Sequence, residues 1–187
     1  MAVCSIKHNC TMACLNDCSF FDKSKNDYYT TKEMWENIQH LIPKDKTIYE
    51  ACLMNSKSNS KQYLKDLGYN VVGDKTWNCL DFAPIRYDVI VTNPPFETKI
   101  KKAILQHFVT LDKPFIIILN SMNIYTKYFR EIFKEQIKDL QVIVPKGKIK
   151  FEIFNEETGF MEPCKDPAFY CCYLAFKMKI PNDKVWL

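Results

Sequence analysis

The segment Tyr-Asp-Val-Ile-Val-Thr at residues 87–92, followed directly by Asn93-Pro94-Pro95-Phe96, carries the clearest structural signal in this 187-residue chain. Its apolar, β-branched residues predict a buried strand. Two successive prolines fix two φ angles near −65° and remove two backbone donors, so the strand has to end there. Pro94 also keeps Asn93 out of the helical region. We therefore expect a rigid loop at the carboxyl end of a buried strand.

Apolar segments and helical patterns alternate along most of the chain. Fully apolar strands separated by amphipathic helices are typical of a parallel sheet covered on both faces. We therefore predict an α/β domain with a doubly wound, mostly parallel sheet. Strands are expected at residues 47–52, 69–73, 87–92, 114–119, 140–144 and 168–178, and helices at 32–42, from 55 or 56 to 67, 99–111 and 128–137.

The composition narrows the class of protein. A chain that is 47% hydrophobic and 26% charged is typical of a soluble globule. No run of eighteen apolar residues is present, and the first twenty residues lack a secretory pattern, so we expect no membrane association. Nine cysteines, an odd number, then indicate reduced thiols in an intracellular chain. The net charge of +4 permits a polyanionic partner without requiring one.

Residues 1–27 differ from the remainder and predict a cysteine-bearing arm before a single domain at 28–187. Three interpretations of the arm are open: cysteines packed as small hydrophobes, which we favour, a zinc site, or disulfide pairing. The four-residue spacing of three of the cysteines would place them on one helix face, but the usual C-x₂-C knuckles are absent. The candidate zinc ligands are Cys4, His8, Cys10, Cys14 and Cys18.

The loop at 93–96 suits a planar substrate with an exocyclic amine. Ligands of open parallel sheets bind outside the carboxyl ends of the strands. The Asn93 side-chain oxygen and the Pro94 carbonyl could each accept one amine N–H, and Phe96 could stack on the base, a contact worth roughly 1–3 kcal/mol. Such catalysis needs mainly proximity and orientation. In the competing interpretation, the prolines only end the strand and Phe96 packs in the core.

Asn93-Pro94-Pro95-Phe96 resembles the catalytic motif of S-adenosylmethionine-dependent amino-methyltransferases, which act on adenine N6 and less often on cytosine N4, guanine N2 or glutamine amides. The segments Lys146–Phe154, Phe169–Tyr173 and Lys184–Leu187 resemble a small stand-alone group of adenine methyltransferases from viruses and microbial eukaryotes. The resemblance covers residues 28–187. It implies a Rossmann-like class I methyltransferase fold and methyl transfer to adenine N6 in RNA or DNA.

The resemblance also implies a cofactor site for S-adenosylmethionine. Tyr28–Thr31, followed by Trp35, resembles the segment that touches the methionine part, and Ile48-Tyr49-Glu50 resembles the acidic end of the first strand. Asp81-Phe82 resembles the segment that contacts the adenine. Asp74 follows the second strand, where such folds place a carboxylate on the ribose. The candidate cofactor-binding residues are Tyr29, Thr30, Thr31, Glu50, Asp74, Asp81 and Phe82.

The loop at residues 51–60 departs from the family pattern because it contains no glycine. Glycines there let the backbone approach the cofactor, whereas asparagine and serine only tolerate the turn. Two hypotheses follow. The favoured one is an active methyltransferase, and the alternative is a catalytically inactive methyltransferase-like fold that serves as a structural or nucleic-acid-binding subunit of a larger complex.

Two sets of lysines predict contact with nucleic acid. Lys146, Lys148 and Lys150 alternate along an extended segment, and Lys99, Lys101 and Lys102 follow the loop at 93–96, so both sets could guide a phosphate backbone. Charged strand edges also protect against aggregation, which is the alternative. A chain this short has no room for a separate recognition domain, so a protein partner could supply specificity. RNA or an unpaired base is favoured over duplex DNA, because it needs no base flipping.

Overall fold

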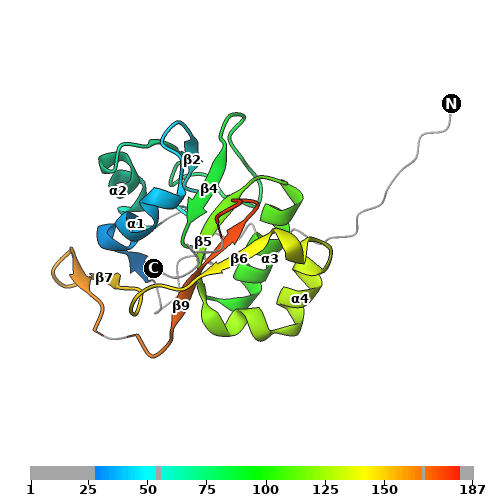
Figure 1. Cartoon of the computed structure of the whole chain (residues 1–187). Coiled ribbons are helices and arrows are strands. Elements are labelled where there is room, and N and C mark those ends of the chain that lie inside the picture. Colours follow the sequence, from blue (N-terminus) through cyan, green and yellow to red (C-terminus); the bar gives the residue numbers. More distant parts are fainter. Residues whose placement is uncertain (1–27, 54–55, 166, 182–187) are drawn as a thin grey trace.

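The structure, a computed structural model, describes residues 28–53, 56–165 and 167–181. Its central element is a six-stranded sheet with the strand order β3-β2-β4-β5-β9-β6 (Figure 1). Five strands run in one direction, and β9 alone is antiparallel to its two neighbours, β5 and β6. The six strands are β2 (Thr47–Tyr49), β3 (Asn70–Val72), β4 (Val89–Thr92), β5 (Phe115–Asn120), β6 (Leu140–Ile143) and β9 (Cys171–Phe176).

A second, three-stranded sheet has the order β1-β7-β8 and is wholly antiparallel. It brings the start of the described chain against a hairpin that begins far later in the chain, at Phe151. The strands are β1 (Tyr29–Thr30), β7 (Phe151–Asn155) and β8 (Phe160–Pro163).

Helices cover both faces of the larger sheet, with α1 and α2 on one side and α3 and α4 on the other (Figure 1). Successive side chains of β4 point to opposite faces of the sheet, and both faces are apolar. Val91 packs in the same core cluster as Trp35 of α1, and Ile90 packs with Ile104 of α3. The helices are α1 (Lys32–Ile38), α2 (Ser60–Asp66), α3 (Thr98–Thr110) and α4 (Lys127–Phe133), with 3₁₀ helices η3 (Gln39–Leu41), η4 (Ser121–Tyr125) and η5 (Lys134–Asp139).

The predicted doubly wound, mostly parallel α/β sheet is confirmed. Three expected helices are shorter than predicted. The helices expected at 32–42 and 128–137 continue past Ile38 and Phe133 as η3 and η5, and the helix expected from 55 or 56 begins only at Ser60. The last expected strand begins only at Cys171. No helix among residues 28–53, 56–165 and 167–181 has the length and apolar character needed to cross a bilayer.

Gly73 allows the ends of β2 and β3 to meet. Its φ is +133°, and a Cβ atom there would lie 2.3 Å from the carbonyl oxygen of Glu50. Side chains avoid this backbone region, and no real Cβ contact is that short. Glycine is therefore required where the loop after β3 passes Glu50.

We expect Gly73→Ala to lower the free energy of unfolding by about 3 kcal/mol or more, because it combines an unfavourable φ with a backbone clash. Gly68→Ala is the matched control, since Gly68 also has a positive φ (+86°) but no atom within 4 Å of the added Cβ. That variant should lose only about 1 kcal/mol. Urea titration of both variants measures the difference, and equal losses would contradict the clash.

Candidate functional site

The carboxyl ends of β2, β3 and β4 lie side by side at one edge of the sheet. Register places Tyr49 opposite Val72 on one side and Ile90 on the other. Glu50 follows β2 directly and Gly73-Asp74 follow β3, whereas β4 extends two residues past Ile90 to Thr92 before Asn93. Three of the sequence-predicted positions, Glu50, Asp74 and Asn93, thus meet at this edge, which is where open α/β sheets bind ligands.

The carboxylate of Glu50 is buried (2% exposed) and fully bonded inside the protein. Its Oε2 accepts a hydrogen bond from Ser60 Oγ, at the start of α2, at 2.5 Å. Its Oε1 accepts from Thr92 Oγ1 and, at 3.3 Å, from the Cys52 backbone N–H. Cys52 N–H also donates to Thr92 Oγ1 at 3.0 Å. This group, the Glu50 network, joins the loop after β2, the start of α2 and the end of β4.

Burial raises the pKa of Glu50 from 4.5 to about 7, although the three donors favour the charged form. The hydrogen bonds of the Glu50 network therefore offset only part of the desolvation penalty of the charged carboxylate. With both oxygens engaged, Glu50 holds the loop in place. Contact with a cofactor ammonium, which the family resemblance implies, would require an oxygen to exchange one of these partners.

Asn93 has a fixed amide orientation. Its Nδ2 donates to the Tyr28 carbonyl oxygen at 2.8 Å. A carbonyl can only accept, so the nitrogen must face Tyr28 and the side-chain oxygen must face away. Asn93 Oδ1 is buried and has no hydrogen-bond partner among the described residues. Such an atom is costly to leave unsatisfied, and it supplies a free acceptor at the strand end.

Phe96 lies in a cluster of four aromatic rings. Its centroid is 5.5 Å from Tyr28, 5.7 Å from Phe151 and 5.1 Å from Phe169. The first two contacts are edge-to-face, and Phe169 is tilted by 41°. These neighbours come from three distant parts of the chain. They give the loop an apolar wall and leave Phe96 half-buried instead of freely exposed.

Lys101 is a site residue whose role differs from the one expected. It is only 4% exposed, and its Nζ donates to the Phe96 carbonyl oxygen at 3.0 Å. Burial lowers the pKa of its amine, and the nearby thiol of Cys171 partly opposes that shift. The lysine therefore secures the end of the 93–96 loop from α3, and its amine faces inward and not towards a phosphate backbone.

Two threonines beside the loop carry unsatisfied hydroxyls. Thr30 Oγ1 and Thr31 Oγ1 are buried without a hydrogen-bond partner among the described residues, and Thr30 is 1% exposed. The adjacent Tyr28 carbonyl is the one that holds Asn93. The segment predicted to touch the methionine part of a cofactor thus brings unsatisfied polar atoms to the same region as Asn93 Oδ1. Tyr29, between Tyr28 and Thr30, is buried in β1.

The remaining candidate cofactor residues lie in the loop after β3 and are exposed. Asp74 Oδ1 accepts from the backbone N–H and hydroxyl of Thr76 at 2.9 and 2.7 Å, and these bonds lower the pKa of its carboxyl. Asp81 Oδ2 accepts from Asn78 at 2.8 Å. Phe82 is 44% exposed and packs against Trp77, with ring centroids 4.6 Å apart.

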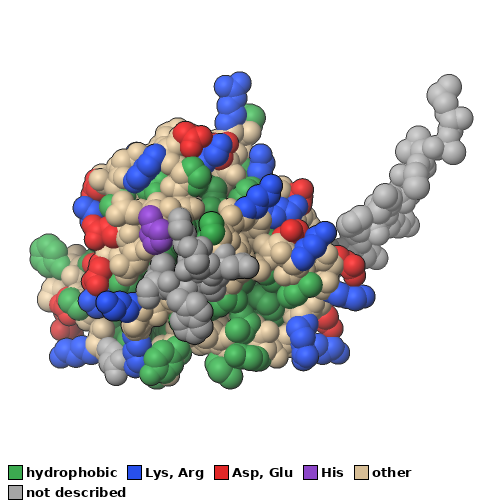
Figure 2. All heavy atoms as spheres, in the orientation of Figure 1, with side chains coloured by type: hydrophobic (Ala, Val, Ile, Leu, Met, Phe, Trp, Pro, Cys, Tyr) green, Lys and Arg blue, Asp and Glu red, His purple; other side chains and the backbone are tan. Residues whose placement is uncertain are grey.

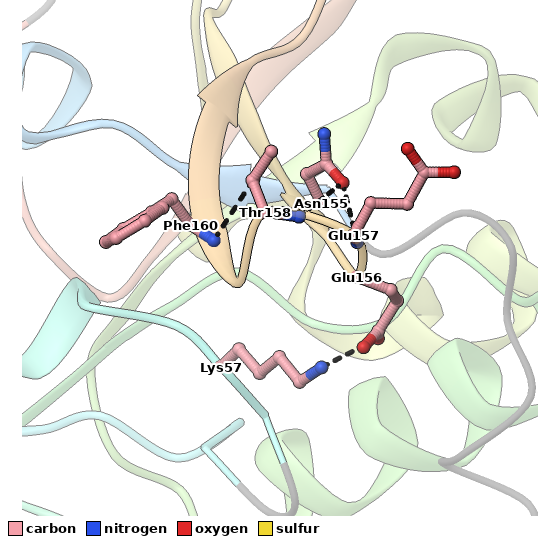
Figure 3. A network of polar contacts seen from close by, with 6 residues as sticks. All are labelled: Lys57, Asn155, Glu156, Glu157, Thr158 and Phe160. Atoms are coloured by element: carbon pink, nitrogen blue, oxygen red, sulfur yellow. Dashed lines mark hydrogen bonds and ion pairs between the residues drawn. The ribbon is translucent and has the colours of Figure 1, made fainter.

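The glycine-free loop reaches the β7–β8 hairpin, a contact that the sequence did not indicate. Within the loop, Ser56 N–H donates to the Leu53 carbonyl at 3.0 Å. From the residues that follow, Lys57 forms an ion pair with Glu156 at 2.7 Å, at the tip of the hairpin (Figure 3). Lys57 Nζ also lies 3.5 Å from the centroid of the Phe154 ring. The hairpin therefore closes over one end of the loop.

The predicted lysine row is only partly available to a ligand. Lys150 forms an ion pair with Glu33 at 2.9 Å, and Lys148 lies over the Tyr170 ring at 5.0 Å. Lys146 is exposed.

The candidate zinc ligands Cys4, His8, Cys10, Cys14 and Cys18 lie outside the described residues. Within the described part of the chain, no group of three or more His, Cys, Asp or Glu side chains could hold a metal ion.

The similarity of this chain to known proteins is weak. No protein-family model matches the chain. No curated protein matches it significantly. Among solved structures, the chain is similar to a SAM-dependent O-methyltransferase from Thermotoga maritima, with a TM-score of 0.39 and 10% sequence identity. That match covers 87% of this chain and 70% of the other.

The pKa of Glu50 predicts an unusual pH dependence of stability. The folded pKa (about 7) lies above the ordinary value of 4.5, so the folded state prefers the protonated form. Stability is then highest below about pH 4.5 and falls, by up to roughly 3 kcal/mol, as the pH rises to 7. Glu50→Gln cannot ionise and should lack this component.

Chemical denaturation between pH 4.5 and 8 measures the contribution of Glu50 to the pH dependence of stability. The stability of Glu50→Gln minus that of the wild type should increase with pH over this window. Glu131→Gln, an exposed position on α4, is the control and should follow the wild type at every pH. Parallel curves for Glu50→Gln and the wild type would contradict the buried, protonated carboxyl.

Proposed function

We propose that this protein transfers a methyl group from S-adenosylmethionine to an exocyclic amine, with adenine N6 in RNA or DNA as the favoured target. The observation that carries the proposal is the buried Oδ1 of Asn93, which has no hydrogen-bond partner in the described part of the chain and is held in one orientation by the Tyr28 carbonyl. A fixed acceptor that lacks a donor suits a substrate that brings an N–H. An exocyclic amine brings two.

The residues at the sheet edge fit the cofactor. Its methionine part carries an ammonium and a carboxylate, and the buried hydroxyls of Thr30 and Thr31 need hydrogen-bond partners of that kind. Asp74 follows β3, the position for a carboxylate on ribose hydroxyls, and it is exposed. Phe82, with 44% of its surface exposed, offers a ring to the adenine. When bound, S-adenosylmethionine supplies an electrophilic methyl group.

The chain's own residues would orient the amine. Asn93 Oδ1 and the Pro94 carbonyl each accept one N–H, which points the nitrogen lone pair away from the loop and raises its electron density. Lys101 holds the Phe96 carbonyl, so the loop cannot drift as the substrate enters. Phe96 and Phe169 supply aromatic surface beside the base. Positioning of this kind accounts for a large part of the rate enhancement in many enzymes.

A second candidate function rests on the Glu50 network. Both carboxylate oxygens are engaged internally, and Lys57 ties the loop after β2 to the hairpin. A site closed in this way favours a methyltransferase-like fold that no longer binds cofactor and acts as a structural or nucleic-acid-binding subunit of a larger complex. Cofactor binding separates the two candidates.

We expect the full chain to bind S-adenosylmethionine in isothermal titration and to transfer a labelled methyl group to adenine-containing single-stranded oligonucleotides. Asn93→Ala should lower kcat by about 100-fold or more with little change in cofactor Kd, because it removes an acceptor made for the reacting amine. Asn70→Ala, on the exposed edge of β3, is the matched control and should keep full activity.

Oligonucleotides that carry cytosine or guanine as the only amine-bearing base identify the target. Absence of heat at millimolar cofactor, together with absence of methyl transfer, would overturn the enzymatic proposal and support the structural one. Transfer to cytosine or guanine alone would retain the reaction and correct the base.

A further inference from the structure

Two tyrosines are exposed at the carboxyl edge of the sheet, beyond the 93–96 loop. Tyr125, at the end of η4, is 70% exposed, and Tyr170, directly before β9, is 68% exposed. Register pairs Asn120 with Cys171, and Ser121 N–H donates to the Tyr170 carbonyl at 2.9 Å. The short helix that carries Tyr125 is thus attached to the residue that carries the second ring.

This surface continues directly from the candidate site. Tyr170 follows Phe169, and the Phe169 ring lies 5.1 Å from Phe96. The exposed ring is therefore carried by the residue next to the aromatic wall of the 93–96 loop. A strand of nucleic acid with its target base at Asn93 would place the neighbouring nucleotides near this edge.

Positive charge accompanies the rings. Lys148 Nζ lies 5.0 Å from the centroid of the Tyr170 ring. Lys146, two residues before Lys148, is exposed, and so are Lys99 and Lys102 on the first turns of α3. Figure 2 shows hydrophobic side chains gathered along the lower surface of the molecule, with Lys or Arg side chains to either side.

We propose that Tyr125, Tyr170 and Lys148, the edge platform, bind the nucleotides that flank the target base in a single-stranded nucleic acid. The assignment rests on the proposed function for its target base. Exposed rings stack on bases of any sequence, and lysines follow the backbone. In a duplex, the base faces are already stacked on one another, so the platform distinguishes single strands from duplexes.

The test is equilibrium binding, which needs neither cofactor nor reaction. Fluorescence anisotropy with a fluorescein-labelled single strand of about fifteen nucleotides, as RNA and as DNA, measures Kd for the full chain. Tyr170→Ala and Tyr125→Ala should each weaken binding about five- to tenfold, and Tyr170→Trp should restore it. Phe160→Ala is the matched control, because Phe160 is 73% exposed but lies on the β7–β8 hairpin and points away from the network at its tip (Figure 3).

Lys148→Gln tests the charge. It should reduce the slope of log Kd against log salt by about 0.7, the value for one phosphate contact on a single strand. Equal Kd values for RNA and DNA would assign recognition to bases and phosphates, and tighter RNA binding would add contacts to the 2′-hydroxyl; both support the platform.

The outcomes separate this inference from the proposed function. Weaker binding by the tyrosine variants supports the platform even if no methyl transfer is found. Methyl transfer with unchanged Kd and KM in both tyrosine variants overturns the platform and retains the enzyme. Equal affinity for a blunt duplex and a single strand also overturns the platform. So does a result in which the tyrosine variants keep oligonucleotide binding but lose self-association or binding of a protein partner.

Discussion

A single buried carboxylate holds together the edge of the sheet on which the candidate site is built. Glu50 accepts from Ser60, Thr92 and the Cys52 backbone, and these groups belong to the start of α2, the end of β4 and the loop after β2. Because a buried polar group that loses its hydrogen-bond partner is costly, the three segments are held as one unit. Thr92 immediately precedes Asn93, so the direction in which the 93–96 loop leaves the sheet depends on Glu50.

A second set of contacts connects the segments that surround this edge of the sheet. Tyr28 holds Asn93 through its carbonyl, and the next two residues form β1 against β7. From β7, Glu152 accepts from Tyr63 of α2 at 3.3 Å. The site is therefore enclosed by segments that are distant in sequence and attached to one another. A change at the hairpin can reach Asn93 through β1, without passing through the larger sheet.

Much of the fold could be predicted from the sequence, because its signals are local. The apolar runs that became β4 and β5 and the four-residue spacing of Ile100, Ile104 and Phe108 in α3 are visible within a few residues. The β7–β8 hairpin was missed, although Phe151 and Ile153 alternate with polar residues and Gly159 marks the turn. Its mixed, half-exposed faces lack the apolar run that identified the other strands.

The candidate site was predictable in its position and less so in its surroundings. The prolines located the loop, but the aromatic neighbours of Phe96 come from three separate segments and carry no local signal. The inward direction of Lys101, in contrast, did have a local signal in the sequence. Lys101, Leu105 and Phe108 share a face of α3 by their four- and three-residue spacing, and both apolar members are buried. A charge on an apolar face indicates a specific partner.

The reversed strand β9 has a consequence for the order in which the protein forms. It lies between β5 and β6, and β6 pairs with β9 but with no other strand of the described sheets. During synthesis, β6 emerges before β9, the strand with which it pairs. The edge of β6 therefore stays unpaired until residues 171–176 have left the ribosome. Phe169 and Tyr170 arrive at the same moment. Assembly of the sheet and completion of the aromatic wall beside Asn93 are thus one late event, and a nascent chain that stops short of β9 exposes an unpaired strand without a finished site.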